Sequence, residues 1–362
     1  MSNPARTQPT AKSTRVFLDL THLGRHVTGI ERVSIEQFEK VGFAGADVTA
    51  VRANGTLSLI FNQQIRLPWL AWRHRDAKFV FPGFPPSPLF ALAKNRVHWY
   101  VHDLFLITRR ADLGLRAKLY MAPQFAFAVK RLTHFQVNSQ KTAAELAPFV
   151  TKDAEIRLYR PAVANVFNLT VDGRVERPSN PRPLKIVTLG TVEPRKNYSA
   201  GLTILDALAK AGHPAQLHIV GRKGWGAAQD ALKDHPSVVI HGYLPTDRVK
   251  ALIEDADLYL CTSHDEGLGL PLLEAQYAGL SLIAPDKAVF REVLGTSAIF
   301  IDPSAPQDAA EKISAHLAHP GWRARSAAAA LANIARWNGL AASDATQVRK
   351  MFTPHPMPHP AV

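Results

Sequence analysis

The chain has 362 residues, of which 46% are hydrophobic and 20% charged, and it contains no long low-complexity tract. This composition predicts a folded protein, and the length favours two domains of about 150 to 200 residues each. Its 43 Lys and Arg residues against 30 Asp and Glu leave a net charge of +13. Such an excess favours a polyanionic partner, whether nucleic acid, an anionic membrane surface or a phosphate-bearing substrate, and charge alone does not choose among them.

The two ends of the chain are expected to lie outside the folded domains. Residues 1–14 are polar and lack the apolar core of a signal peptide, and residues 346–362 read as a loose tail. No stretch reaches the roughly 20 apolar residues of a membrane-spanning helix. The single cysteine, Cys261, lies in an apolar run. It excludes an intramolecular disulfide and fits a core position in a protein of the reducing cytoplasm.

The first domain is expected over residues 15–165. RVFLDLT, from Arg15, predicts a buried strand, and it is followed by a glycine-bearing loop and a helical pattern through Phe38. Further short apolar runs occur at HWYVHDL, THFQVNS and AEIRLYRP, and segments with helical spacing separate them. This alternation predicts an α/β domain with a mainly parallel sheet.

The second domain is expected over residues 166–345 and repeats the scheme. Five strands are predicted at LKIVTLG, AQLHIVG, SVVIHGY, DLYLCTS and LSLIAP, each followed by a loop and a helix. The boundary region, RPAVANVFNLTVDGRVERPSNPRP, is rich in Pro, Asn and charge. In two doubly wound domains of this kind, the loops at the carboxyl ends of the strands face a shared cleft.

The segment SHDEGLGLPLLEA carries the main functional signal. Pro271 suits the first turn of a helix, because its missing N–H would have no partner there. We expect Glu274 in the same first turn. The preceding EGLG loop offers free backbone N–H groups at the positive end of the helix dipole. The segment therefore predicts a phosphate site beside two carboxylates, Glu266 and Glu274, that accept hydroxyl protons.

Together with its flanks, this E-x7-E pattern resembles the retaining GT-B glycosyltransferases of family 4, which include bacterial mannosyltransferases. The resemblance covers about Val16 to Trp337. It implies two Rossmann-like doubly wound domains that face a central cleft. It also implies that Glu266 holds the donor sugar and that Glu274 binds the nucleotide ribose. The backbone amides of Gly267, Leu268 and Gly269 would then face the donor.

The segment LGTVEPRKN adds two cations to this expected site. Gly190 ends a strand, and Arg195 and Lys196 would neutralise the donor diphosphate and stabilise the charge that develops as the sugar leaves. The resemblance therefore implies no metal and no cofactor beyond the nucleotide-sugar co-substrate. The commoner family pattern has an arginine directly after the glycine, where this chain has Thr191.

Two further segments resemble the nucleotide side of the family. HIVGRKGWG places Gly221 at a strand end near the base pocket, with Trp225 read as a packing residue, and HGYLPTDRV offers Tyr243 and Leu244 for backbone contacts. Neither segment distinguishes guanine from uracil.

Two more segments resemble the acceptor side. HLGRHVTGIERV resembles the glycine loop over the donor phosphates, with Gly29 as the close-approach position. YVHDLF makes His102 the catalytic histidine of the first domain, oriented by Asp103.

The resemblance implies a metal-independent, retaining hexosyltransferase, with mannose from GDP-mannose as the favoured donor. The implied acceptor is a saccharide or a polyprenyl-diphosphate-linked saccharide in surface polysaccharide biosynthesis. The segment Ile65 to Phe90 combines Trp69, Trp72 and Phe84 with Arg66, Arg73, Arg75 and Lys78. This combination suggests an anionic membrane surface as a further partner of a cytoplasmic protein.

Two alternatives stay open at this point. One is a GT-B sugar-nucleotide binder or epimerase without transferase activity. The other is a basic nucleic-acid-binding protein, which the dispersed cations and the absence of a recognised binding motif disfavour.

Overall fold

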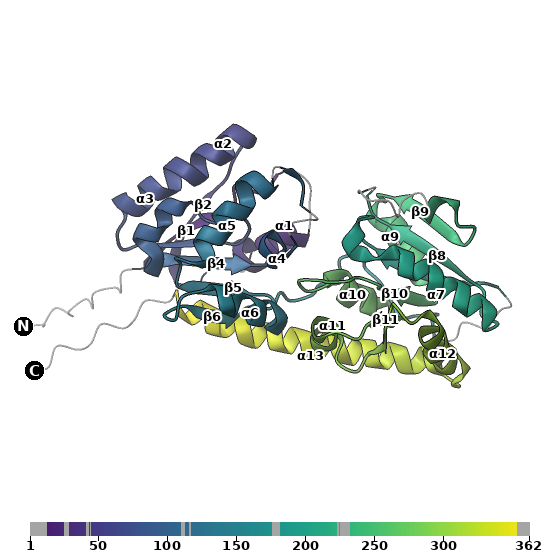
Figure 1. The fold of residues 1–362 in the computed structure, drawn as a ribbon. Coiled ribbons are helices and arrows are strands. Elements are labelled where there is room, and N and C mark those ends of the chain that lie inside the picture. The colour runs from purple at the N-terminus through teal and green to yellow at the C-terminus, as the bar shows by residue number, and fades with distance from the viewer. Residues whose placement is uncertain are drawn as a thin grey trace, which may run out of the picture. The chain divides into compact units, whose positions relative to one another are not determined.

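The computed structural model describes residues 13–24, 29–40, 43, 45–109, 113–115, 117–175, 182–222, 224 and 232–352. The chain divides into two units, each built on a parallel sheet (Figure 1). The first unit takes the described residues up to Asn138, then Thr142–Pro161 and the residues from Ala342 on. The second takes Ser139–Lys141 and Ala162–Ala341. The expectation of an α/β protein with two doubly wound sheets is confirmed.

In the first unit the described strands follow the order β2-β1-β3-β4-β5-β6. They are β1 (Thr14–Asp19), β2 (Ala46–Val51), β3 (Lys78–Phe81), β4 (Val97–Val101), β5 (His134–Val137) and β6 (Glu155–Leu158). The helices are α1 (Gly29–Val33), α2 (Thr56–Phe61), α3 (Leu67–Arg73), α4 (Phe105–Thr108), α5 (Ala122–Val129) and α6 (Gln140–Leu146). Shorter π or 3₁₀ segments are η1 (Ser34–Lys40), η2 (Asn62–Arg66), η3 (Pro88–Arg96), η5 (Ala117–Met121) and η6 (Ala147–Phe149).

In the second unit the described strands follow the order β12-β11-β10-β7-β8-β9. They are β7 (Leu184–Leu189), β8 (Ala215–Val220), β9 (Val238–Gly242), β10 (Leu258–Leu260), β11 (Ser281–Pro285) and β12 (Ala298–Ile301). The helices are α7 (Tyr198–Lys210), α9 (Thr246–Asp255), α10 (Leu270–Ala275), α11 (Ala288–Leu294), α12 (Pro306–Ala318) and α13 (Trp322–Lys350). The 3₁₀ turns η7 (Pro194–Lys196) and η8 (Gln276–Ala278) complete it.

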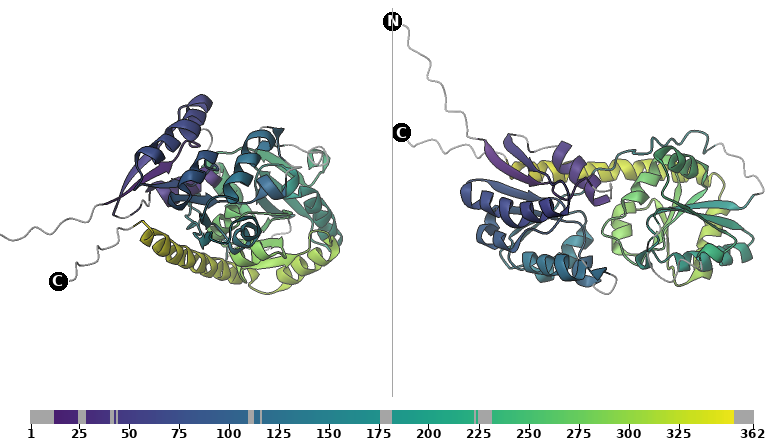
Figure 2. Two further views of the ribbon diagram at one scale, coloured as in Figure 1. Left: turned by 60° about the vertical axis from the view of Figure 1, so that its left-hand side comes forward. Right: turned by 90° about the horizontal axis from the view of Figure 1, so that it is seen from above.

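Both faces of the second sheet are covered, as the right-hand view of Figure 2 shows. Successive strand residues enter opposite cores: Ile186 packs in one apolar cluster, and Val187 packs in the other. A strand buried on both faces reads as a continuous apolar run, which is why β7, β10 and β11 were visible in the sequence.

Three strands were not predicted. β2 is an edge strand with mostly exposed residues, and β3 and β12 span only four residues each. The edge strands β2 and β12 need fewer buried side chains, which weakens their apolar signal, whereas the central strand β3 is buried but too short to stand out.

The C-terminal helix corrects the expected tail. Residues 346–350 are helical, and α13 extends to Lys350, the long yellow helix of Figure 2. From Ala342 on, the chain groups with the first unit. The reason is packing: Val348 and Phe352 are buried, and the Phe352 ring lies 4.4 Å from that of Phe43. The buried pair Arg160 and Asp344, with N and O 2.8 Å apart, fixes the same end. Apart from Ser139–Lys141, the second unit begins at Ala162, just before the expected boundary at residue 165.

None of the helices in the described ranges combines the length and hydropathy that crossing a bilayer requires.

Candidate functional site

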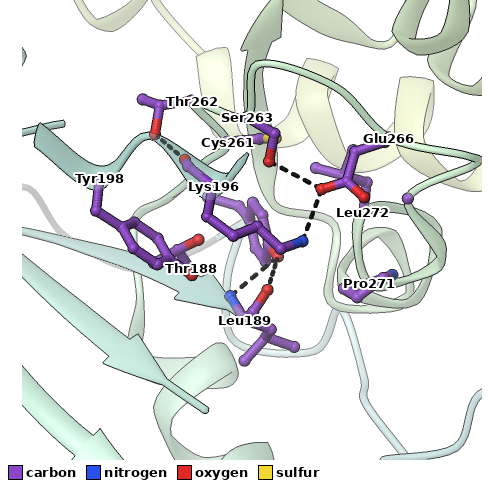
Figure 3. A pocket seen from close by; sticks show the side chains of 12 residues that line it. Thr188, Leu189, Lys196, Tyr198, Cys261, Thr262, Ser263, Glu266, Pro271 and Leu272 are labelled. Carbon is purple, nitrogen blue, oxygen red and sulfur yellow. Dashed lines mark hydrogen bonds and ion pairs between the residues drawn. The ribbon is translucent and has the colours of Figure 1, made fainter. Parts of the chain in front are cut away.

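The candidate site lies in the second unit, where the loops after β7 and β10 meet. These strands are neighbours in a parallel sheet, so their carboxyl ends share one edge. Two hydrogen bonds join the loops: Thr262 Oγ1 donates to the Lys196 carbonyl at 3.0 Å, and the His264 N–H donates to the Arg195 carbonyl at 2.8 Å. A small pocket opens here, lined by Lys196, Tyr198, Ser263, Glu266 and Gly269 among others (Figure 3).

The carboxylate of Glu266 is the centre of this pocket. It receives Lys196 Nζ at 2.6 Å and the Ser263 hydroxyl at 2.8 Å on one oxygen, and Arg195 Nη1 at 2.5 Å on the other. Figure 3 shows Lys196 and Ser263 pointing at the same carboxylate oxygen. Burial opposes the charge on Glu266, but the two cations prevail and lower its pKa to about 2. The group is therefore a fixed anion at neutral pH.

Arg195 bridges two carboxylates. Its Nη2 donates to Glu193 at 2.5 Å, while Nη1 holds Glu266 and the Asp265 carbonyl. The pKa of Arg195 rises above its ordinary value, because Glu266 and Glu193 outweigh the effect of burial. The four side chains Glu193, Arg195, Lys196 and Glu266 thus carry two negative and two positive charges in a largely buried cluster.

Glycines let the strand ends approach this cluster. A Cβ on Gly190 would lie 3.0 Å from Lys196 Cε, and the φ of +150° also disfavours a side chain. A Cβ on Gly221 would lie 2.0 Å from the Gly190 carbonyl oxygen, which no side chain tolerates. Gly221 follows β8 directly, so its predicted place at a strand end is confirmed.

The helix after the EGLG loop begins one residue earlier than expected. Gly269, at φ +88°, is the N-cap of α10, which starts at Leu270 with Pro271 in its first turn. The expectation that Glu274 lies in that first turn is wrong, because the earlier start makes Glu274 the fifth residue of the helix. Its side chain is buried. It does not line the pocket of Glu266, whereas Pro271 and Leu272 do.

The remaining predicted donor residues are spread around the same edge. Gly267 is half-buried, whereas the Leu268 side chain is buried in the core and only its backbone is left to face a ligand. Thr191 is half-buried and Leu244 packs on the core, whereas Tyr243 is exposed beside the Arg222 guanidinium, 5.6 Å from its ring. Trp225 lies outside the described residues.

His102 belongs to the first unit, directly after β4. Its Nε2 lies 2.7 Å from the Pro82 carbonyl, which can only accept, so Nε2 carries the proton. Burial lowers the pKa of His102 to about 4. The ring is therefore neutral at pH 7, and Nδ1 is a hydrogen-bond acceptor. Asp103 Oδ1 accepts the Phe105 N–H. Gly29 begins α1, and a Cβ there would have no heavy atom of the described residues within 4 Å, so packing against them does not require glycine.

Sequence reasoning missed three members of the site. Glu193 and Ser263 bind the charged cluster, and the Tyr198 hydroxyl donates to the Gly190 carbonyl at 3.2 Å. The only signal for Glu193 was its position next to the basic residues of VEPRK. Ser263 gave no signal, because hydroxyl side chains are common in loops.

Comparisons with known proteins fit this geometry. Residues 173–333 match the family described as Glycosyl transferases group 1. The serotype-specific mannosyltransferase WbdA of Escherichia coli is 30% identical over 138 residues, which cover 36% of this chain and 17% of that protein. The chain thus spans less than a fifth of the length of that relative. These matches confirm the resemblance that the E-x7-E segment indicated.

Two solved structures share the fold. WaaG, a glycosyltransferase involved in lipopolysaccharide biosynthesis, superposes with a TM-score of 0.63 at 15% identity, over 94% of this chain and 100% of its own. Anabaena HepE in complex with UDP gives a TM-score of 0.66 at 15% identity, over 93% and 99%. The expectation of two Rossmann-like domains of the GT-B type is confirmed.

Proposed function

We propose that this chain, whose residues 173–333 match the glycosyl transferases group 1 family, is a retaining hexosyltransferase. The donor is a nucleotide-diphosphate sugar, with mannose from GDP-mannose favoured by the likeness to a mannosyltransferase. The acceptor is a saccharide, free or linked to a polyprenyl diphosphate, in surface polysaccharide biosynthesis.

The observation that carries the proposal is the Glu266 cluster. Lys196 and Arg195 are held at a sheet edge by Glu266, and the EGLG loop that carries Glu266 ends at Gly269, the N-cap of α10. An arriving diphosphate supplies phosphate oxygens that compete with Glu266 for Lys196 and Arg195. Glu266 then gains free acceptor capacity, which suits the paired hydroxyls of a sugar.

In the proposed transfer step, the donor, the acceptor and the chain's own side chains supply every reacting and stabilising group. The bond between the anomeric carbon and the β-phosphate oxygen breaks, and the acceptor oxygen bonds to the same carbon on the same face. The acceptor proton passes to an oxygen of the leaving phosphate. Lys196 and Arg195 stabilise the charge that grows on that phosphate. The family resemblance assigns His102 to the transferred sugar, and its neutral ring offers Nδ1 as a hydrogen-bond acceptor for that role.

The test is a panel of nucleotide sugars offered with oligosaccharide acceptors and EDTA. We expect GDP release from GDP-mannose, a product whose anomeric configuration by NMR matches the donor, and loss of turnover in Glu266→Ala and Lys196→Ala. Lys312→Ala, which removes an exposed cation of the same unit, is the matched control and keeps full rate. Tight donor binding without turnover would instead favour a sugar-nucleotide binder, and no binding of any donor would reject the site.

The first unit supplies a surface suited to a lipid-linked acceptor. Segments α2, η2 and α3 form one continuous helical stretch over residues 56–73 (Figure 1). Large apolar side chains recur at helical spacing along its outer face and are between 53% and 85% exposed: Leu57, Phe61, Ile65, Trp69 and Trp72. The opposite face is buried through Leu59, Leu67 and Ala71. Exposed apolar stripes of this kind mark interaction surfaces.

The structure changes the membership of the membrane-binding patch that was predicted over Ile65 to Phe90. Phe84 packs against His22, with ring centroids 5.6 Å apart, and Lys78 lies over the Phe352 ring, so neither joins the tryptophans. Arg66, Arg73 and Arg75 remain exposed beside the stripe, and residues 56–75 contain no acidic residue. Amphipathic helices with aromatics and cations lie at anionic membrane interfaces, where each near-surface cation contributes about 1 kcal/mol. This surface supports our proposal that the enzyme works in the cytoplasm, on the inner face of the membrane.

Flotation with vesicles of phosphatidylglycerol and phosphatidylethanolamine tests this part separately. We expect binding that weakens with salt and that is reduced at least tenfold in Trp69→Ser/Trp72→Ser. Leu92→Ser is the matched control, since Leu92 is 92% exposed but lies outside the helical stretch. Equal flotation of both variants would exclude the stripe as the docking surface.

A further inference from the structure

A second pocket lies at the opposite edge of the second sheet. Its lining includes Ser281 and Ala298, the first residues of the parallel strands β11 and β12. The Glu266 cluster follows the carboxyl ends of strands in the same sheet, so the two sites occupy different edges. The pocket has a volume of about 290 Å³, at the lower end of the range of small-molecule sites. We call it the amino-edge pocket.

Three polar side chains in this pocket form a closed hydrogen-bonded group. Ser281 donates to Ser326 at 2.5 Å, and His316 Nε2 lies 3.0 Å from Ser281 Oγ and 3.3 Å from Ser326 Oγ. If Nε2 donates to Ser281, the Ser326 hydroxyl proton is uncommitted. If Nε2 accepts from Ser326, Nδ1 carries the uncommitted proton instead. In either tautomer the group keeps one donor for a ligand.

The electrostatic character of the pocket is positive. Arg325 lies on its wall with an exposed guanidinium, which uses Nη1 to donate to His319 at 2.8 Å. Burial, with Arg325 and His319 nearby, lowers the pKa of His316. None of the described residues that line the pocket is acidic, and Thr296 adds a hydroxyl at the exposed side. Several donors without a carboxylate favour an anionic, oxygen-rich ligand.

The rest of the wall is apolar. Leu282, Ala298, Ile299 and Ala329 line the pocket beside the polar group. A bare inorganic ion would leave these side chains in water, whereas a ligand with a carbon skeleton covers them. The planar guanidinium of Arg325 matches the oxygens of a phosphate group in a bidentate manner.

We propose that the amino-edge pocket binds a small phosphate monoester, with the phosphate against Arg325 and the Ser326–His316 pair and the carbon skeleton against Ile299 and Ala329. This site is separate from the proposed donor site, and the proposal holds whether or not the chain transfers sugars.

Calorimetric titration of the full chain with glucose 6-phosphate, inorganic phosphate and glucose tests it. We expect glucose 6-phosphate to bind, inorganic phosphate to bind more weakly and glucose not to bind. Arg325→Gln should weaken binding of the ester roughly tenfold, through loss of a charge-assisted contact. Arg248→Gln removes the same charge from an exposed position on α9 and should bind like the wild type.

Lys196→Met separates this pocket from the donor site. If it abolishes binding of the ester while Arg325→Gln does not, the phosphate binds at the donor site and the proposal is wrong. The proposal also fails if the ester produces no heat, or if inorganic phosphate binds as tightly as the ester.

Discussion

The charge balance around Glu266 predicts that the contribution of this carboxylate to stability can be separated from its contribution to turnover. Glu266→Gln leaves Lys196 without its carboxylate in a site where the Lys196 side chain is only 15% exposed. Arg195 keeps Glu193, so the unbalanced charge falls on Lys196. Adding Lys196→Met removes that charge and restores neutrality.

The distance sets the size of the effect. At 2.6 Å, an ion pair in a medium of effective dielectric constant about 20 attracts by on the order of 6 kcal/mol before desolvation is subtracted. Removing one partner of a buried pair costs about 3 to 5 kcal/mol, whereas replacing both is often close to neutral. We expect a loss of about 3 kcal/mol for Glu266→Gln and within about 1 kcal/mol of the wild type for the double variant.

Thermal unfolding measures this difference. For a unit of this size, about 3 kcal/mol corresponds to a fall in Tm of roughly 6 to 12 °C. The double variant should recover most of the Tm but none of the turnover, because Glu266 and Lys196 are both needed to hold the donor. The exposed pair Lys312 and Asp308 is the control, where Asp308→Asn should cost no more than about 0.5 kcal/mol.

The pH dependence has a defined sign. The cations lower the pKa of Glu266 from 4.5 to about 2. Its stabilising contribution is complete above pH 4.5 and is lost as the pH falls toward 2. The Tm difference between wild type and Glu266→Gln should therefore shrink over that range. An unchanged Tm for Glu266→Gln at pH 7, or recovery of turnover in the double variant, would refute the reasoning.

Three further predictions concern backbone space and buried charge. In urea titrations, Gly221→Ala should lower the free energy of unfolding by about 3 kcal/mol or more, since its Cβ would overlap the Gly190 carbonyl. The control Gly339→Ala, whose Cβ would have no heavy atom of the described residues within 4 Å beyond the backbone of α13, should instead raise it by about 1 kcal/mol. Burial lowers the pKa of His98 to about 3, and neither ring nitrogen has a partner within the described chain. Below pH 6.5 the unfolded chain binds a proton at His98 that the folded chain does not, so the free energy of unfolding decreases as the pH is lowered from 6.5. His98→Phe should therefore be about 2 kcal/mol more stable than wild type at pH 5. Equal slopes of stability against pH in the two proteins would contradict this. Asp344→Asn, which removes the carboxylate paired with buried Arg160 at 2.8 Å, should cost about 3 kcal/mol by thermal unfolding, against almost nothing for exposed Asp153→Asn.

The sequence by itself determined the parts of the protein that depend on local pattern. Strands buried on both faces, such as Leu184–Leu189, read as apolar runs, and Gly190 and Gly221 marked where those strands end. Glu266 and Pro271 both line the pocket, because a loop and the helix that follows it are neighbours along the chain, whereas Glu274 of the same segment does not line it.

Only the tertiary structure decided which side chains meet. Arg195 and Lys196 follow β7 and Glu266 follows β10, so sheet order rather than sequence distance brings these ion pairs together. The same holds for the amino-edge pocket, where Ser281 begins a strand and His316 and Ser326 lie on two helices. The burial of Phe352 was also hidden, because a short apolar segment gives no sign of the surface it will cover. Local pattern specifies the elements, whereas long-range pairing selects the contacts between them.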